Sequence, residues 1–424
     1  MARNTNSKTI MMTCTAAVAA AVMALAGCGA SSSSSAGSTD SKSESQAFYA
    51  AAMFPQTGSL AYLGTPEEAG FKLALADINA AGGVNGADAQ SSIADTSDGD
   101  HADQNSAAAQ SALSKNPSVV IGPPSSSVVK NSYKQVTSAG VPMISQGATS
   151  TAFSGLDKNF FRVIPPDTVQ GAVLGQVIAQ DGVKNLAIAV FNDEYGTSLR
   201  DVVVKTVESA GVNVVYGEKD AFDPAETNFS SIVTAIKAAS PDAVLVIAFD
   251  QSKSIFKELA SQGVDTHKLY MTDGNTADYS KDLDAGLLEG SKGTIPGAHP
   301  GEDFQARLKT QVKDLKDYTY AAETYDAVIL AALAATKGGD NKPATVSANL
   351  MAVSGANGGT ECSTYKDCVA ALKSGKDIKY KAQSGIGAFN DDHDPATASI
   401  GVYKFDASNK PNFDHAQEGA VPTK

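Results

Sequence analysis

Short apolar runs alternate with longer amphipathic stretches along most of this chain. The runs are apolar throughout, which is typical of strands buried on both faces. Their alternation with helices therefore favours parallel sheets covered by helices on both sides. The expected strands are Phe48–Met53, Ser118–Gly122, Val141–Ser145, Asn185–Phe191, Val212–Tyr216, Asp242–Ala248 and Lys268–Thr272. The expected helices lie near residues 102–114, 126–139, 167–181, 196–210, 226–239 and 251–263.

A further helix is predicted to begin at Thr65. Thr65 can cap a helix, Pro66 suits the first helical position, and Glu68 completes a capping box. Apolar residues then recur at helical spacing, and Gly82-Gly83 predicts the end of the helix. The whole chain has 424 residues, more than one hydrophobic core usually serves. We therefore expect an α/β protein with two lobes.

The N-terminus has the pattern of a secretory signal. Arg3 and Lys8 form a short positive region, and an alanine-rich apolar run follows at Ala16–Ala26. This run is shorter than the roughly 20 apolar residues that a bilayer span needs. It ends in LAGC, which resembles a bacterial lipobox, in which the cysteine is acylated. We expect residues 1–27 to be a signal peptide and Cys28 to carry the lipid; a plain signal peptide with a chance cysteine is the alternative.

A serine-dominated segment follows, from Gly29 to about Gln46. It holds too little apolar surface to offset the entropy of ordering itself. We expect residues 28–46 to form a flexible tether between the lipid and the folded body, with the acyl chains supplying the membrane affinity.

The folded body is acidic. Removal of residues 1–27 leaves 397 of the 424 residues and takes away two positive charges, so the net charge changes from −13 to −15. Nucleic acid is therefore not expected as a partner, because phosphate backbones attract the opposite sign.

Two cysteines remain in the body after Cys14 is lost with the signal and Cys28 takes the lipid. Cys362 and Cys368 lie in the sequence ECSTYKDC, where an exported protein is more often found with a small disulfide loop than with a metal site. The five histidines are scattered without ligand spacing, so we expect neither a metal ion nor a cofactor.

Two loops rich in small and hydroxyl residues follow neighbouring expected strands. They are Gly122–Ser127 and Ser145–Ser150, and each precedes an expected helix start. Ligands of such sheets bind at the carboxyl ends of strands, where helix N-termini and hydroxyls can hold a carboxylate. Ordinary helix capping by Ser126 and Thr149 is the alternative for each loop, and the pairing of two similar loops favours the ligand site.

The ordered series of motifs resembles the branched-chain amino-acid (Leu/Ile/Val) binding proteins of ABC importers, which have the type I periplasmic-binding fold. The likeness extends from about Gln46 to Phe405, although no single motif is strong. The motifs that carry it are GSLAYLG at Gly58–Gly64, FKLALADINAAGGVNG at Phe71–Gly86, the two hydroxyl loops, FNDEYGTSL at Phe191–Leu199, Asp273-Gly274, and TYAAETYDAVILAALAA at Thr319–Ala335.

The resemblance implies a site for a zwitterionic ligand. Ser126 and Thr149 match residues that bind the ligand α-carboxylate by hydroxyl and backbone N–H, with Gly147 and Ala148 as flanking contacts. Asp273 matches the acidic residue that pairs with the α-ammonium. The remaining matched positions are Tyr195, which closes over the ligand, Tyr320, Leu63 and Pro124, which line the side-chain pocket, and Phe249 and Asp250, which lie near another contact of the second lobe.

The site departs from the family pattern at two places. Asp273 is shorter by one methylene than the glutamate common at this position, so it must come closer to the ammonium or use a water molecule. Pro123 and Pro124 remove two N–H donors from the first loop, so the anion site depends on Ser125, Ser126 and the second loop. The family also includes binders of amides, short peptides, urea and aromatic acids, so the identity of the side-chain pocket stays open.

The resemblance also implies how the chain is divided. We expect two doubly wound parallel-sheet lobes joined by a three-strand hinge, with crossings near Val163–Pro166, Thr294–Gly297 and Gly385–Phe389. Ligand binding would close the hinge, and the closed form would dock on a permease. The expected parts are residues 47–164 with 296–386 for lobe 1, and residues 165–295 with 387–424 for lobe 2.

An enzyme and a receptor-coupled sensor are the two alternative classes of function. Enzyme motifs are not found, and the acidic clusters at Asp95–Asp100 and Asp391–Asp394 do not fit calcium-loop spacing, so solvated loops explain them. A sensor of the same fold that feeds a receptor remains open. We expect a monomeric, membrane-anchored solute-binding lipoprotein that faces outside the cytoplasm.

Overall fold

The computed structural model describes residues 46–423. The expected signal peptide, the lipidation site at Cys28 and nearly all of the tether lie outside the described residues. Within the described part, no helix combines the length and the apolar character that a membrane span requires.

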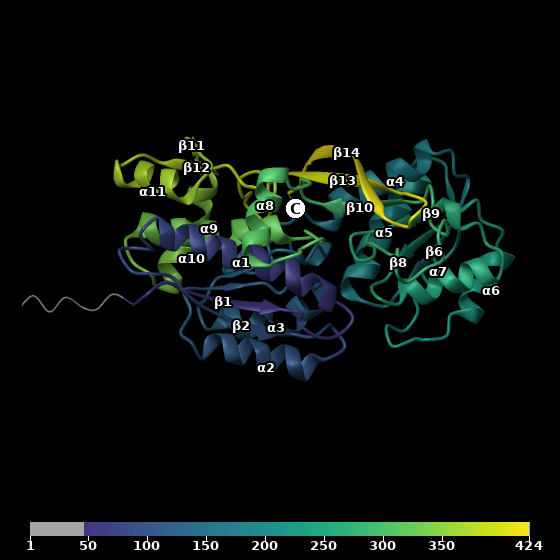
Figure 1. The fold of residues 1–424 in the computed structure, drawn as a ribbon, viewed down its shortest axis with the longest axis horizontal. Helices are drawn as coiled ribbons and strands as arrows, with labels where there is room; N and C mark the ends of the chain where they lie inside the picture. The colour runs from purple at the N-terminus through teal and green to yellow at the C-terminus, as the bar shows by residue number, and fades with distance from the viewer. Residues whose placement is uncertain (1–45, 424) are drawn as a thin grey trace, which may run out of the picture. The chain divides into compact units, whose positions relative to one another are not determined.

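The first sheet has five parallel strands in the order β2-β1-β3-β4-β5. Its core is divided by the sheet. One face packs against α1 and the late helices α9 and α10, and the other packs against α2 and α3 (Figure 1). The strands are β1 (Tyr49–Phe54), β2 (Gln90–Asp95), β3 (Val119–Ile121), β4 (Met143–Ser145) and β5 (Phe160–Arg162). The helices are α1 (Ala61–Ala80), α2 (Ala102–Leu113), α3 (Ser126–Ser138), α8 (Glu302–Gln311), α9 (Ala321–Gly338), α10 (Pro343–Ser354) and α11 (Tyr365–Lys373).

The second sheet has seven strands in the order β14-β13-β10-β9-β8-β6-β7. The strands from β6 to β10 are parallel, whereas β13 runs antiparallel to both β10 and β14. The strands are β6 (Asn185–Val190), β7 (Asn213–Tyr216), β8 (Ala243–Ile247), β9 (Leu269–Met271), β10 (Lys292–Pro296), β13 (Thr397–Phe405) and β14 (Pro411–Ala420). The helices are α4 (Asp167–Gln180), α5 (Glu194–Ser209), α6 (Ser230–Ala238) and α7 (Ser252–Ser261).

The chain passes between the two sheets three times. It does so between β5 and α4, after β10, and on the way into β13. A buried ion pair joins the first and third passages: Arg162 Nε lies 2.5 Å from Asp394 Oδ1. Arg162 also donates to the carbonyl oxygens of Ala148 and Ser150, so the end of β5 is held to the second hydroxyl loop. A buried charge pair with its remaining donors satisfied fixes this geometry.

The predicted start of the first helix is wrong. The helix α1 begins at Ala61, and Pro66 lies inside it rather than at its first position. Thr65 therefore does not cap α1, and Glu67 is fully buried. The cause is close packing: a Cβ on Gly64 would lie 2.4 Å from the carbonyl oxygen of Pro55, so glycine lets the first turn pack against the end of β1.

The other expected helices are present, but seven of the strands in the described part were not foreseen: β2, β5, β10, β11 (Thr360–Cys362), β12 (Ile378–Tyr380), β13 and β14. The strand β2 is partly exposed and polar, and β5 has three residues, so neither shows an apolar run of useful length. The small parallel pair of β11 and β12 lies beside α11. There, Cys362 and Cys368 form a disulfide.

Candidate ligand-binding site

Residues from both sheets meet around a small cavity of about 20 Å³. The first sheet supplies the loop after β3, the loop after β4 and the start of α9, and the second supplies the loop after β9 and the start of α5. The carboxyl ends of parallel strands therefore form the site, as expected for such sheets. The cavity is lined by Leu60, Tyr62, Leu63, Pro124, Ser125, Ser126, Gly147, Tyr195, Phe249, Asp273, Gly274 and Tyr320.

Asp273 is the buried carboxylate of this site, with 7% of its surface exposed. Its Oδ1 accepts hydrogen bonds from the Tyr195 hydroxyl and from Gln170 Nε2, each at 2.7 Å, and its Oδ2 accepts from the Tyr320 hydroxyl. Burial raises the pKa of Asp273, and hydrogen bonds from Tyr320, Tyr195 and Gln170 oppose that rise. No cation among residues 46–423 pairs with it, so neutral donors alone hold this carboxylate.

The two tyrosines reach Asp273 from different sides. Tyr195 lies in the first turn of α5, and its ring stacks on Phe249 with centroids 5.8 Å apart. Tyr320 precedes α9 and has a left-handed backbone with φ of 60°, which turns its side chain toward the other sheet. Burial, followed by the charge of Asp273, raises the pKa of both phenols. Both hydroxyls therefore stay protonated and act as donors.

The hydroxyl loops are bonded largely to each other. Ser125, not Ser126, is the N-cap of α3 and accepts from the N–H of Val128 at 3.3 Å. Ser126 Oγ accepts from the N–H of Ser150 at 3.2 Å, which ties the first loop to the second. Thr149 is buried. The alternative of capping by Ser126 and Thr149 is thus wrong in detail, since Ser125 takes that role.

Three of the expected site residues do not line the small cavity. Ala148 and Thr149 lie behind Gly147, and the N–H of Ala148 donates to Ser145 Oγ at 3.0 Å. Asp250 is largely exposed and pairs with Lys253 at 2.8 Å, because the chain turns outward after Phe249. Asp250 therefore belongs to the wall of a neighbouring, larger cavity.

Three residues near Asp273 were missed by the sequence reasoning. Gln170 donates to Asp273, and the Tyr62 hydroxyl donates to the carbonyl oxygen of Gly274 at 2.8 Å. Asp167, the first residue of α4, is fully buried. Burial raises the pKa of Asp167 to about 7. An aspartate after Pro166 at a helix start was the available signal, since acidic residues favour that end of the helix dipole.

The chain is similar to known binding proteins. The family model described as periplasmic binding protein matches residues 49–395. A leucine-, isoleucine-, valine-, threonine- and alanine-binding protein from Pseudomonas aeruginosa is 29% identical over 307 residues, which cover 70% of this chain and 80% of that protein. A Leu/Ile/Val-binding protein homolog from Brucella suis is 28% identical over 299 residues, which cover 69% of this chain and 79% of that protein.

Solved structures share the fold. The branched-chain amino-acid transporter substrate-binding protein LivJ from Streptococcus pneumoniae, solved with isoleucine, has a TM-score of 0.72 at 20% identity and covers 88% of this chain and 100% of that one. A leucine-binding protein from Thermotoga maritima has a TM-score of 0.72 at 18% identity, with 87% of this chain and 98% of that one covered. These likenesses show the type I periplasmic-binding fold. With the family model spanning most of its length, the chain belongs to the periplasmic binding protein family: it is an extracytoplasmic solute-binding protein, not an enzyme.

Proposed function

We propose that this protein is a lipid-anchored solute-binding protein of an ABC importer that captures an amino acid, branched-chain or related, and delivers it to a permease. The observation that carries the proposal is the buried Asp273 carboxylate. It faces a cavity between two sheets, and its partners within residues 46–423 are hydroxyl and amide donors without a cation. An α-ammonium would supply the missing positive charge and form charge-assisted hydrogen bonds.

The opposite end of the ligand would lie against the first sheet. There the N-terminus of α3 and the loop at Gly147 face the cavity. Helix N–H groups and the helix dipole bind a carboxylate without a buried positive side chain. Ser125 and Ser126 supply hydroxyls beside this helix start. The arrangement offers an anion site and a cation site on different sheets, as a zwitterion requires.

Asp167 adds a second acidic group near Asp273, at the ammonium end of the ligand. It is buried and lies close enough to Asp273 for that carboxylate to raise its pKa further, after burial itself. A ligand ammonium would favour the ionised form of both acids. The side chain of the ligand would then face Leu63 and Pro124, the apolar part of the wall.

Closure of the two lobes would trap the ligand. Polar contacts join the lobes beside the cavity: Ser127 Oγ donates to Asp193 Oδ2 at 2.5 Å, and Ser150 Oγ donates to Glu194 Oε1 at 2.9 Å. A ligand that touches both sheets stabilises this closed arrangement by its differential affinity. The closed form would present a surface for a permease. A receptor-coupled sensor would use the same closure, and co-purification with permease or with sensor proteins separates the two roles.

The relatives support an amino acid as the ligand. The Pseudomonas protein is named for binding leucine, isoleucine, valine, threonine and alanine, and the Streptococcus structure holds isoleucine. Another solved structure of the same fold, from Rhodopseudomonas palustris, holds 4-hydroxybenzoate at a TM-score of 0.72 and 16% identity. That ligand carries a carboxylate without an ammonium, so the role of Asp273 decides between the two ligand types.

Calorimetric titration tests the proposal. Leucine and its des-amino analogue 4-methylpentanoate are compared in the wild type and in Asp273→Asn. We expect leucine to bind at least tenfold more tightly than the analogue in the wild type, and the two to bind within about threefold in the variant. Equal binding of both ligands by the wild type would remove Asp273 from the ammonium site. For the anchor, Cys28→Ser should release the protein from the membrane fraction of producing cells; retention there contradicts lipidation at Cys28.

A further inference from the structure

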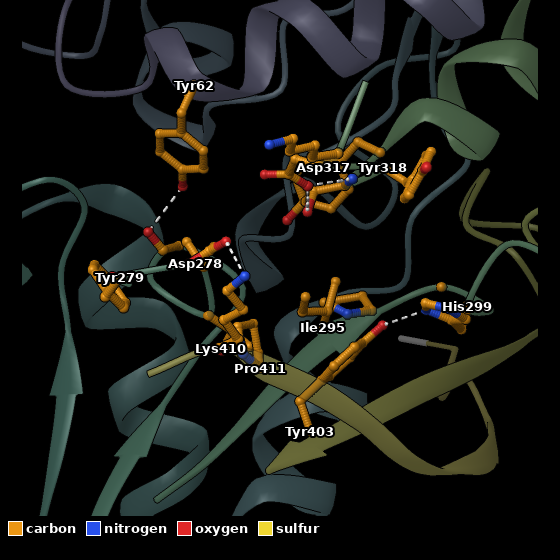
Figure 2. A pocket seen from close by; sticks show the side chains of 18 of the residues that line it. Tyr62, Asp278, Tyr279, Ile295, His299, Asp317, Tyr318, Tyr403, Lys410 and Pro411 are labelled. Atoms are coloured by element: carbon orange, nitrogen blue, oxygen red, sulfur yellow. Dashed lines mark hydrogen bonds and ion pairs between the residues drawn. The ribbon is translucent and has the colours of Figure 1, made fainter. Parts of the chain in front are cut away.

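A second cavity, of about 460 Å³, lies beside the Asp273 pocket. The two spaces share Tyr62, Phe249, Gly274 and Tyr320 as lining residues. Figure 2 shows the larger cavity with Tyr62 at its edge, and the Tyr62 hydroxyl donates to the carbonyl oxygen of Gly274. The small pocket has room for about one water molecule. A ligand held at Asp273 therefore has space to extend mainly toward the larger cavity.

The charges around the larger cavity are unbalanced. Five carboxylates and three lysines line it, and three of the carboxylates are exposed, whereas Asp317 is half-buried and Glu323 is buried. Lys253 pairs with Asp250 and Asp282, and Lys410 lies 3.8 Å from Asp278 (Figure 2). The carboxylates are Asp250, Asp278, Asp282, Asp317 and Glu323, and the lysines are Lys253, Lys316 and Lys410.

Glu323 is the buried member of this set, with 3% of its surface exposed. It lies in the first turn of α9 and lines the cavity, and no cation among residues 46–423 pairs with it. Burial, followed by the charge of Asp326, raises its pKa well above the usual range. Asp317 is half-buried nearby and accepts from the N–H and hydroxyl of Thr319, and none of the ion pairs in the described part of the chain includes it.

The backbone holds Glu323 at the cavity wall. A Cβ on Gly297 would lie 1.9 Å from Glu323 Oε1, so only glycine at this crossing between the sheets leaves room for the carboxylate. Tyr320, whose hydroxyl bonds to Asp273, lies three residues before Glu323, and both side chains line the larger cavity. One extended side chain can therefore run from Asp273 past Tyr320 to Glu323.

The remaining polar groups add no buried positive charge. Burial lowers the pKa of His299, so its ring is neutral at pH 7. Its Nδ1 lies 3.3 Å from the Tyr403 hydroxyl, as Figure 2 shows. The rings of Tyr318 and Tyr403 line the same space and offer π-faces, which attract cations.

We propose that the larger cavity is a second subsite that binds the ammonium or guanidinium end of an extended amino acid, with Glu323 as the counter-ion. The inference rests on the proposed function, because it requires the α-groups of the ligand at Asp273. It extends that function to amino acids with a long cationic side chain. A cation in this cavity would compensate a carboxylate that is otherwise buried alone, which is the arrangement that makes such a charge tolerable.

Matched ligands test the subsite in calorimetric titrations of the purified chain. Arginine and citrulline have nearly the same shape, but citrulline carries a neutral urea in place of the guanidinium. We expect arginine to bind at least tenfold more tightly than citrulline. Glu323→Gln should bring the two affinities within about twofold while leucine binding stays unchanged, which also shows that the variant is folded. Asp317→Asn is a second variant and should reduce the arginine preference about threefold.

Glu68→Gln is the matched control, because Glu68 lies on α1, pairs with Lys72, and does not line either cavity. It should leave the arginine preference unchanged. Equal binding of arginine and citrulline by a protein that binds leucine overturns the subsite and leaves the proposed function intact. Agmatine, which lacks the α-carboxylate, tests the cation site without the proposed function. If no amino acid binds, but agmatine binds and Glu323→Gln abolishes that binding, the cation site is supported and the proposed function is overturned. Failure of all four ligands to bind overturns both.

Discussion

The Tyr320 hydroxyl donates a hydrogen bond to the Asp273 carboxylate, and this bond joins the two sheets at the centre of the site. Tyr320 precedes a helix that packs on the five-stranded sheet, whereas Asp273 follows a strand of the seven-stranded sheet. The residues are 47 positions apart in the chain. The bond therefore depends both on the relative position of the two lobes and on the charge of the Asp273 carboxylate.

Tyr320→Phe should weaken leucine binding about tenfold. The variant keeps the ring but removes a donor that lowers the pKa of Asp273, and a hydrogen bond to a charged group contributes about 1.5 kcal/mol. The dissociation constant at pH 7 measures the effect. Tyr318→Phe is the control, because the Tyr318 hydroxyl donates only to the Leu315 carbonyl and should leave leucine binding unchanged. Equal affinities for Tyr320→Phe and the wild type would mean that this donor is dispensable.

Asp167 should make the empty protein less stable as the pH rises. Burial raises its pKa from 3.8 to about 7 in the folded state, so the folded state binds more protons than the unfolded state between these values. Its contribution to stability is therefore present below pH 4 and is lost as the pH rises to about 7. The loss is on the order of 4 kcal/mol at most, at 1.36 kcal/mol for each pKa unit.

Asp167→Asn supplies the comparison for this pH effect, because asparagine does not titrate. Urea unfolding of both proteins at pH 5 and pH 7.5, without ligand, should show a steeper fall in the free energy of unfolding for the wild type. Other groups titrate equally in the two proteins and cancel in the difference. Parallel pH profiles would show that Asp167 stays ionised in the folded state.

Much of the fold could be predicted because the buried strands carry their own signal. Ala243–Ile247 is apolar at every position, so both its type and its burial follow from the sequence. Gln90–Asp95 is an edge strand with polar, partly exposed side chains, and nothing local distinguishes it from a loop. The start of α1 was wrong because a capping signal at Thr65 competes with tertiary packing around Gly64, which one sequence does not display.

The site was predictable only where it follows strand ends or matches a family motif. Ser125 and Ser126 follow β3, and Asp273 follows β9, so their positions after strand ends predict that they lie in a ligand site. Gln170 and Tyr62 lie within helices and reach the site through long-range hydrogen bonds, which leave no local pattern. The orientation of Asp250 could not be predicted either, because a single turn after Phe249 decides which way its side chain points.

Ser127→Ala should weaken ligand binding about fivefold. Ser127 donates to Asp193 at 2.5 Å and accepts from the N–H of Glu194 at 3.2 Å, so both bonds join the lobes only when they are closed. Loss of about 1 kcal/mol from the closed form lowers its population and hence the apparent affinity. Titration gives the affinity, and small-angle scattering with saturating ligand gives the fraction of closed molecules.

Lys130→Ala serves as the control for Ser127→Ala. Lys130 also crosses between the lobes, at 2.7 Å from Glu194, but 64% of its side chain is exposed. An exposed ion pair is screened by solvent, so the affinity should change less than twofold. A larger effect of Lys130→Ala than of Ser127→Ala would contradict closure by the partly buried hydrogen bonds of Ser127.

Reduction of the Cys362–Cys368 disulfide should lower the free energy of unfolding by about 2 kcal/mol, because the bond closes a short loop in the unfolded chain. Neither cysteine lines a cavity of the site, so leucine affinity should not change. Urea unfolding with and without a thiol reductant measures the difference. The double variant Cys362→Ser/Cys368→Ser should be insensitive to the reductant; a reductant effect that persists in it would assign the stabilisation elsewhere.

Gly147→Ala should reduce leucine affinity more than tenfold without large loss of stability. A Cβ at this position would lie 2.7 Å from Pro124 Cβ and 3.0 Å from the Tyr320 ring, so the ring must shift to accept it. Such a shift separates the Tyr320 hydroxyl from Asp273 and narrows a pocket of about 20 Å³. Gly301→Ala is the control, because a Cβ on Gly301 would have no neighbour within 4 Å. Gly140→Ala is unsuitable as a control, because the positive φ of Gly140 would strain an alanine there. If Gly147→Ala and Tyr320→Phe act through the same contact, the double variant should lose little more affinity than Gly147→Ala alone; additive losses would show that the methyl group blocks the ligand directly.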